Sequence, residues 1–265
     1  MDFVVVKDIA QGIERTKEFL YDEVDRKTVL FLSGGKTPKA LYETLAKEQI
    51  LTPAAVGMID ERFGSPMHAN SNELMVQDSG FLGYLEKQNI PFYSMLENGN
   101  TYQGVARLGD PQKIPASDSL NEDISGGKER QDPKVLQVVN NYDQTVRDLF
   151  FKFPKSIAVV GIGDDGHIAS IFPNRKDFTN PLYVNNNTYE YVVGVDDPGK
   201  YGKRISLTFA GLSLIDFYIV FVFGKEKKRA LKKALQPGSL EEIPARFFQQ
   251  PEISAKTLFI TDQKL

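Results

Sequence analysis

The regular alternation of short apolar runs with amphipathic stretches predicts an α/β fold with a mainly parallel, doubly wound sheet and helices on both of its faces. This alternation continues through the 265 residues of the chain. Two of the runs, 29–32 and 157–160, contain only apolar residues, which is typical of strands that are buried on both faces. No internal repeat or linker interrupts the pattern, so we predict a single domain that spans residues 1–265.

The predicted strands are short runs rich in branched and aromatic side chains. The run 217–223 has the strongest β propensity, and 91–95 is the weakest candidate. In chain order, the predicted strands are 3–6, 28–32, 56–60, 91–95, 157–160, 191–195, 217–223 and 257–260.

The predicted helices are the stretches in which apolar residues recur near helical spacing. Pro38 suits the first position of a helix, and Thr37 just before it can act as the cap. In chain order, the predicted helices are 9–24, 38–47, a helix from about 72, 135–151, 206–214 and 225–235.

One segment, at about 109–133, departs from this pattern. It is rich in Gly, Pro, Ser, Asp and Lys and has little apolar periodicity. Such a composition predicts a polar insertion on the surface. A lid over a substrate site is the more specific alternative for the same segment.

The composition is that of a soluble globular protein, with 41% hydrophobic and 25% charged residues. The net charge of −3 argues against a general nucleic-acid binder, although a small anionic substrate needs only a local basic patch. The absence of cysteine and the presence of only two histidines exclude disulfides, thiolate nucleophiles and His-rich zinc sites. No signal peptide or membrane-length apolar stretch occurs. We therefore expect a cytoplasmic, metal-independent monomer without a membrane or nucleic-acid partner.

The most informative stretch is GIGDDGHIASIFP at 161–173, which follows a predicted buried strand. His167 comes two residues after the carboxylate of Asp165, at what we expect to be the start of a short helix. Helix dipoles at such a start disfavour the imidazolium and keep a neutral ring that can act as a base. The carboxyl ends of strands are where α/β sheets bind ligands. The stretch is therefore either a catalytic site or a helix start that Asp165 caps.

A second stretch, VLFLSGGKTPKAL at 29–41, joins a buried strand to a helix through a glycine-rich turn. Backbone N–H groups in such a turn can approach an anion closely, and the helix start adds favourable dipoles. The spacing is neither that of a Walker A loop nor GxGxxG. The turn is either a tight strand-to-helix connection or a phosphate cradle. The residues of this predicted cradle are Ser33, Gly34, Gly35, Lys36 and Thr37.

A third stretch, at 57–72, carries Asp60, Glu61 and Arg62 at the end of a predicted strand. Arg62 can either bind an anionic substrate or pair with Glu61. For His68 and Asn72 a structural role is favoured, because Ser71-Asn72 suits a helix cap.

A fourth stretch, KYGKRISLT at 200–208, gathers Lys200, Lys203 and Arg204 just before a predicted helical segment. Charges in such a loop are usually solvated. A basic group that faces the Ser-Gly-Gly turn would, however, complete a site for a phosphate dianion.

Together, these four stretches resemble the 6-phosphogluconolactonase family, within the larger superfamily that also holds glucosamine-6-phosphate deaminase. The resemblance spans most of the chain in the family's motif order and is weakest at 109–133. IPARFF at 243–248 resembles a divergent form of a C-terminal signature of the family. The matching segments are SGGKTP at 33–38, DERFGSPMHANSN at 60–72, GIGDDGHIASIFP at 161–173 and RISLT at 204–208.

This resemblance implies a Rossmann-like α/β fold and hydrolysis of 6-phospho-D-glucono-1,5-lactone to 6-phosphogluconate, without a metal or organic cofactor. It implies that His167 is the catalytic general base, with Asp165 as the aspartate of the same motif. It also implies that the Ser-Gly-Gly turn and Arg204, with either Lys200 or Lys203, contact the phosphate. Arg62 would steady the substrate or the developing oxyanion.

The deaminase branch of the superfamily is the nearest alternative. It shares the glycine-rich turn, an aspartate at the position of Asp60 and the Asp-Gly-His core. It also carries a glutamate five residues after the histidine, where this chain has Phe172. The missing carboxylate favours the lactonase. A non-catalytic sugar-phosphate sensor is a second alternative.

Overall fold

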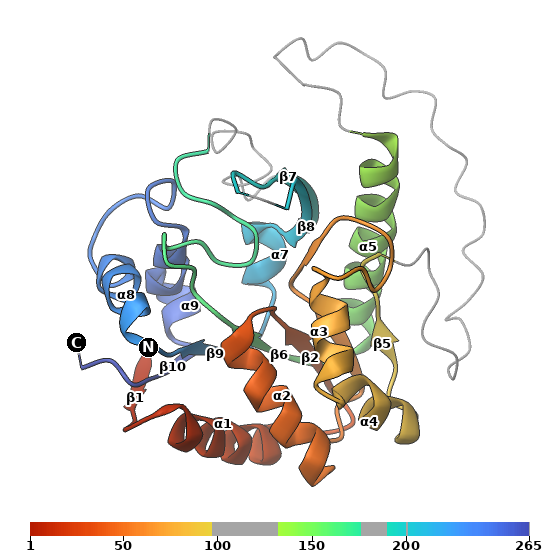
Figure 1. Cartoon of the computed structure of the whole chain (residues 1–265), viewed down its shortest axis with the longest axis horizontal. Helices are drawn as coiled ribbons and strands as arrows, with labels where there is room; N and C mark the ends of the chain where they lie inside the picture. Colours follow the sequence, from red (N-terminus) through yellow and green to blue (C-terminus); the bar gives the residue numbers. More distant parts are fainter. Residues whose placement is uncertain (97–131, 176–189, 200, 265) are drawn as a thin grey trace.

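The centre of the molecule is a seven-stranded sheet in the order β1-β10-β9-β6-β2-β3-β5, in which every neighbouring pair is parallel (Figure 1). The computed structural model describes residues 1–96, 132–175, 190–199 and 201–264. The strands of this sheet are β1 (Asp2–Val5), β2 (Thr28–Leu32), β3 (Ala55–Met58), β5 (Phe92–Tyr93), β6 (Lys155–Val160), β9 (Phe217–Val222) and β10 (Thr257–Thr261).

Helices cover both faces of the sheet. Figure 1 shows α1, α2 and α4 on one side and α5, α7 and α9 on the other. The predicted α/β fold with a mainly parallel, doubly covered sheet is therefore confirmed. The helices are α1 (Ile9–Glu23), α2 (Lys36–Glu48), α3 (Asn72–Asp78), α4 (Phe81–Lys87), α5 (Pro133–Lys152), α7 (Phe209–Ser213), α8 (Lys228–Ala234) and α9 (Pro251–Ser254), with 3₁₀ turns η1 (Lys225–Lys227) and η2 (Pro244–Gln249).

The strand order reverses between β2 and β6. After β2, the next strand of this sheet along the chain is β3, on one side; after β6, the next strand of this sheet is β9, on the other side. The two strands are direct neighbours, with Leu32 paired to Val159 near their carboxyl ends. Loops that leave such a reversal point in opposite directions open a crevice for ligands. The turn after β2 and the loop after β6 therefore start from the same edge of the sheet.

A second, smaller sheet consists of β4 (Asp60–Arg62), β8 (Lys203–Leu207) and β7 (Val192–Asp196), all antiparallel. The predicted strand 56–60 is divided at Ile59 between the two sheets. The predicted helix 206–214 is wrong in its first half, because β8 is held between β4 and β7. The helix α7 begins only after Thr208, whose side chain caps it by accepting from the backbone N–H of Gly211 (3.0 Å).

Buried contacts fix the helices on the main sheet. All five residues of β2 are buried, as the apolar run predicted. On one face, the buried Tyr142 of α5 both donates to the carbonyl of Met58 and accepts from its N–H, each at 2.8 Å. Within the described helices, none is both long and apolar enough to cross a membrane.

The end of the predicted insertion 109–133 forms the start of α5. Asp132 accepts from the N–H of Lys134 (2.9 Å), and Pro133 is the first helical residue. The rest of the insertion lies outside the described residues, and so does the lid proposed for it.

Candidate active site

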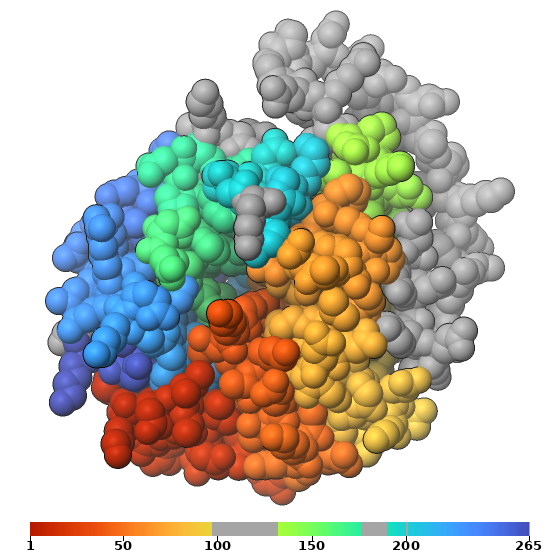
Figure 2. All heavy atoms as spheres, in the orientation of Figure 1, coloured from red at the N-terminus to blue at the C-terminus, as the bar shows by residue number. Residues whose placement is uncertain are grey.

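A pocket of about 610 Å³ opens at the carboxyl ends of β2 and β6. Figure 2 shows the surface hollowed between the start of α2 and the segment 161–175. Most of its walls are the turn after β2, the loop after β6 and the segment after β9. Of the predicted site residues that the structure describes, all except Lys203 line it. These are Ser33, Gly34, Gly35, Lys36, Thr37, Asp60, Arg62, Asp165, His167 and Arg204.

The imidazole of His167 is hydrogen-bonded to the carboxylate of Asp165. Its Nδ1 lies 2.6 Å from Oδ1 of Asp165, and the same oxygen accepts from the His167 backbone N–H at 3.0 Å. Partial burial raises the pKa of Asp165, but the hydrogen bonds from His167 and its charge lower it by more, to about 2. Asp165 is therefore ionised at neutral pH and holds the proton on Nδ1. The other ring nitrogen, Nε2, is left as an acceptor.

The loop that carries His167 is a compact turn. The N–H of Gly163 donates to the carbonyl of His167 (2.9 Å), and the N–H of Gly166 donates to the carbonyl of Gly163 (3.0 Å). A Cβ on Gly163 would overlap the imidazole, since it would lie 2.7 Å from Cγ of His167 and closer still to Nδ1. Gly166 has φ +95°, a conformation that favours glycine. Glycine at these two positions therefore allows the imidazole to lie against the backbone of its own loop.

The expected helix at His167 is wrong. Between 161 and 175 the described chain forms turns and one isolated bridge, Ile168 to Ile171, and no helix starts there. Helix dipoles therefore do not act on the imidazole as predicted. Its proton is positioned by Asp165, and its ring lies tilted against the ring of Phe172 with centroids 5.0 Å apart.

The Ser-Gly-Gly turn leads directly into the 13-residue helix α2, which starts at Lys36. The cap is Gly35, whose φ of +116° suits glycine and which makes no side-chain cap bond. The predicted cap at Thr37 is wrong, because the helix begins two residues earlier than Pro38. The first N–H groups of α2 have no side-chain cap and lie at the pocket wall, so they can receive an anion.

The buried Glu61 holds the start of α3 beside this turn. Its carboxylate accepts from the backbone N–H groups of Arg62 (2.6 Å), Asn72 (2.7 Å) and Glu73 (2.8 Å). Burial raises the pKa of Glu61, although these three donors oppose the rise. Ser71 caps α3 by accepting from the N–H of residue 74 at 3.0 Å, as the predicted Ser-Asn cap required.

Arg62 does not form the alternative ion pair with Glu61. Its Nη1 donates to the carbonyl of Asn70 (2.8 Å), and its guanidinium lies over the ring of Tyr201 (4.8 Å). The second histidine, His68, bonds through Nε2 to the carbonyl of Arg62 (2.8 Å) and does not line the pocket. This position fits the structural role that the sequence favoured for His68.

Arg204 is buried between two carboxylates. Its Nε donates to Asp197 at 2.8 Å, and its Nη1 lies 3.7 Å from Oδ2 of Asp60. The same Asp60 oxygen accepts from Ser170 at 2.6 Å. The guanidinium also lies 5.1 Å from the centre of the Phe172 ring, which contacts the imidazole of the motif as well. Arg204 and His167 thus both lie against this ring.

Neither of the two predicted lysines lies in the pocket wall that the structure describes. Lys200 lies outside the described residues. Lys203 pairs with Asp196 at 2.8 Å on the exposed end of β8, because neighbouring residues of a strand point to opposite faces and the next residue, Arg204, points inward.

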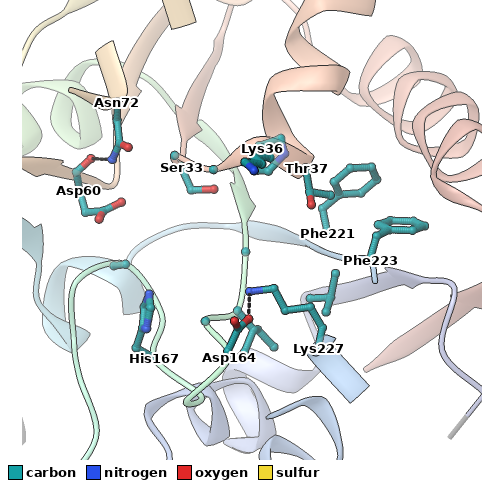
Figure 3. A pocket seen from close by; sticks show the side chains of 18 of the residues that line it. Ser33, Lys36, Thr37, Asp60, Asn72, Asp164, His167, Phe221, Phe223 and Lys227 are labelled. Atoms are coloured by element: carbon teal, nitrogen blue, oxygen red, sulfur yellow. Dashed lines mark hydrogen bonds and ion pairs between the residues drawn. The ribbon is translucent and has the colours of Figure 1, made fainter. Parts of the chain in front are cut away.

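Lys227 was not predicted as a site residue, although it lines the pocket from η1 after β9. Its Nζ lies 2.6 Å from Asp164, so the ion pair bridges the loops that follow β6 and β9 (Figure 3). One feature of the sequence could have indicated Lys227: it comes just after a predicted central strand, at the edge of the sheet where the other site residues were expected.

Three buried side-chain atoms have no hydrogen-bond partner within the described structure, and all three belong to pocket residues. They are Oγ of Ser33, Nε of Arg62 and Oδ1 of Asn72. An unpaired buried polar group costs about 1–3 kcal/mol. Their gathering in one pocket therefore indicates a site built for a polar ligand. In the described residues, no group of three or more His, Asp or Glu side chains is arranged to hold a metal ion.

A parallel α/β sheet with an imidazole–carboxylate pair and an uncapped helix start in one pocket is the arrangement of an enzyme for small anionic molecules. The chain belongs to the glucosamine-6-phosphate isomerases/6-phosphogluconolactonase family, whose model matches residues 4–258. This finding confirms the resemblance that the four motifs indicated.

Individual relatives support the same family. The chain is 29% identical over 248 residues to a 6-phosphogluconolactonase of Xylella fastidiosa (strain 9a5c), covering 89% of this chain and 85% of that protein. It is 27% identical over 258 residues to a 6-phosphogluconolactonase of Nostoc sp., covering 92% and 90%. Among solved structures, the fold is similar to that of 6-phosphogluconolactonase from Leishmania guyanensis, with a TM-score of 0.67, 20% identity and coverage of 98% and 95%.

Proposed function

We propose that this protein hydrolyses 6-phospho-D-glucono-1,5-lactone to 6-phosphogluconate, the activity after which its curated relatives are named. One observation carries the proposal: Nδ1 of His167 is bound to Asp165 at 2.6 Å inside the pocket that the start of α2 also lines. An imidazole fixed through one nitrogen offers the other as a base, and the helix start offers an anion site.

In the proposed reaction, Nε2 of His167 takes a proton from a water molecule as the water oxygen forms a bond to the lactone carbonyl carbon. The tetrahedral intermediate then collapses, and the bond from that carbon to the ring oxygen breaks. The imidazolium returns its proton to the departing ring oxygen. Asp165 stays ionised throughout and stabilises the charged ring. A positioned general base of this kind contributes about 10²- to 10⁴-fold to the rate.

The proposed phosphate site is the uncapped first turn of α2 together with Lys36 and Lys227. Both lysines line the pocket, and among the described residues Lys227 pairs with the exposed Asp164. Arg204 is a weaker candidate for the phosphate than the sequence indicated, because Asp197 and Asp60 already balance its charge. Its position beside the ring of Phe172 favours a role near the reacting end of the substrate.

The family also contains isomerases that act on glucosamine 6-phosphate. Phe172 stands where the deaminase branch has its glutamate, and its buried ring packs against His167 and under Arg204. An apolar ring cannot move a proton between carbon atoms, so this position favours lactone hydrolysis over ring opening and isomerisation.

The test is proton release after freshly generated 6-phosphogluconolactone is added, compared with the spontaneous rate. We expect rapid release with the wild-type protein and a rate close to the spontaneous one with His167→Ala. Binding of 6-phosphogluconate to His167→Ala, measured by calorimetry, should survive. A spontaneous rate with the folded wild-type protein would refute the proposal, and ammonia release from glucosamine 6-phosphate would support the deaminase alternative instead.

A further inference from the structure

The amide of Asn72 carries a buried oxygen that the fold itself does not use. Asn72 is 1% exposed and lines the pocket, and its Oδ1 has no hydrogen-bond partner among the described residues. A buried carbonyl oxygen without a partner is costly, and proteins keep such groups rarely and with a reason. The side-chain nitrogen and the backbone N–H of Asn72 both have partners, which makes the unused oxygen a specific feature.

The surroundings of Asn72 fix which way this oxygen points. Its Nδ2 donates to the backbone carbonyl of Asp60 at 2.9 Å, and its own backbone N–H donates to Glu61 at 2.7 Å. A rotated amide would set its oxygen against the carbonyl of Asp60, and two acceptors repel each other. The first residue of α3 is also held by the Ser71 cap. Oδ1 is therefore a preorganised acceptor.

The Ser-Gly-Gly turn leaves space for this amide. A Cβ on Gly34 would overlap the Asn72 amide, since it would lie 2.7 Å from Nδ2 and closer still to Oδ1. The unpartnered Oγ of Ser33 belongs to the same turn. The acceptor thus lies directly against the turn whose other end starts α2.

The chemistry of an acceptor restricts what it can bind. Phosphate oxygens, a lactone carbonyl and a carboxylate are all acceptors, so a carbonyl oxygen repels them, whereas a hydroxyl group can donate to it. Figure 3 shows Asn72 and Asp60 on one side of the pocket and Lys36 and Lys227 on the other. Oδ1 of Asn72 therefore offers a hydroxyl group an acceptor on the side of the pocket away from Lys36 and Lys227, which suit a phosphate. The guanidiniums of Arg62 and Arg204 line the pocket as well.

We infer that Asn72 is a substrate-binding residue whose Oδ1 accepts a hydrogen bond from one ring hydroxyl of the sugar phosphate. The inference deepens the proposed function and rests on it for the identity of the sugar. Together with the phosphate at the opposite side, this contact fixes the substrate at two points and so sets which carbon faces His167. A site with a buried acceptor for a substrate hydroxyl discriminates against an analogue that lacks this hydroxyl, because the acceptor then has no hydrogen-bond donor.

The experiment compares wild-type protein, Asn72→Ala and the matched control Asn70→Ala. Asn70 is exposed and lies outside the pocket lining. Each protein is assayed with 6-phosphogluconolactone and with its 2-, 3- and 4-deoxy analogues. With the parent lactone, we expect kcat/KM of Asn72→Ala to be roughly 10- to 100-fold lower than that of the wild type. With the wild type, we expect a similar loss of kcat/KM when one of the deoxy analogues replaces the parent lactone. For that analogue, Asn72→Ala should cause no further loss, and Asn70→Ala should behave as wild type throughout.

If Asn72→Ala lowered kcat/KM by the same factor for the parent lactone and for every analogue, the inference would be overturned, because Asn72 would then have a structural role only. Unchanged kcat/KM for the parent lactone would overturn it as well. If Asn72→Ala does not fold, the wild-type series alone decides: equal wild-type kcat/KM for the parent and all deoxy analogues refutes the contact. If the wild type does not hydrolyse the lactone, the proposed function fails separately. Calorimetry with glucose 6-phosphate and its deoxy forms then tests the same contact without turnover.

Discussion

Gly163→Ala provides the sharpest test of how the proposed base is held. The added Cβ would lie 2.7 Å from Cγ of His167 and closer to Nδ1, whereas ordinary contact begins at about 3.4 Å. The ring must therefore move by at least 0.7 Å (3.4 minus 2.7 Å), and Nδ1 by more. The hydrogen bond from Nδ1 to Asp165, 2.6 Å in the native loop, cannot survive that displacement unchanged.

A misplacement of about 1 Å in a catalytic group can reduce the rate about 10²-fold. We therefore expect Gly163→Ala to lower kcat for lactone hydrolysis about 100-fold, while KM changes little because the start of α2 is untouched. Overpacking costs about 1–3 kcal/mol of stability, so the protein should remain folded but melt earlier. The assay is proton release above the spontaneous rate, with thermal unfolding followed in parallel.

The matched control is Gly83→Ala in α4, where an added Cβ likewise meets nothing within 4 Å and which lies outside the pocket lining. Its kcat should stay within about twofold of the wild type, as expected for a substitution without a clash. A wild-type kcat in folded Gly163→Ala would refute the reasoning, because the imidazole would then act without its observed position.

Two further predictions concern charge. Lys227→Ala should lower kcat/KM about 10- to 100-fold, chiefly by raising KM, because it removes a cation from the proposed phosphate site. The control, Lys203→Ala, removes a surface ion pair with Asp196 and should leave kcat/KM unchanged. Equal effects of the two substitutions would contradict the assignment of Lys227 to the phosphate site. The folded pKa of Asp165, about 2, is below its ordinary value of 3.8, so the ionised form stabilises the fold. The stability difference between wild type and Asp165→Asn should be complete above about pH 4 and vanish as the pH falls towards 2; a difference that grows on acidification would rule this out.

Much of the fold could be predicted because its strands are buried on both faces. Such strands read as continuous apolar runs, and β2 lies at Thr28–Leu32, where the sequence placed it. The strand β8 could not be read in this way. Its partners are β4 and β7, of which β4 lies more than 130 residues away along the chain, and its five residues begin with two basic ones. Pairing over such distances overrides local propensity.

The candidate site was partly predictable for a geometric reason. Residues that follow parallel strands meet at one edge of the sheet, so the turn after β2 and the loop after β6 could be expected together. Which lysine joins them could not be predicted from spacing. Lys203 and Arg204 are adjacent, but the pleat of β8 sends one to the surface and the other into the pocket. Lys227 lies in η1 after a third strand, β9, and no local motif connects this segment with the other two.

The side-chain contacts across the pocket could not be predicted from the sequence, because they depend on the space that segments distant along the chain leave between them in the fold. Gly34 and Gly163 appear in the chain as turn residues, yet neither has a positive φ, and each instead leaves room for one polar side chain. One accommodates the amide of Asn72 and the other the imidazole of His167. In the proposed complex, the two glycines therefore make room for two different groups: the first admits a hydroxyl acceptor and the second a base. A glycine in a motif of this kind is better understood by asking which side chain occupies the space beside it than by its backbone freedom alone.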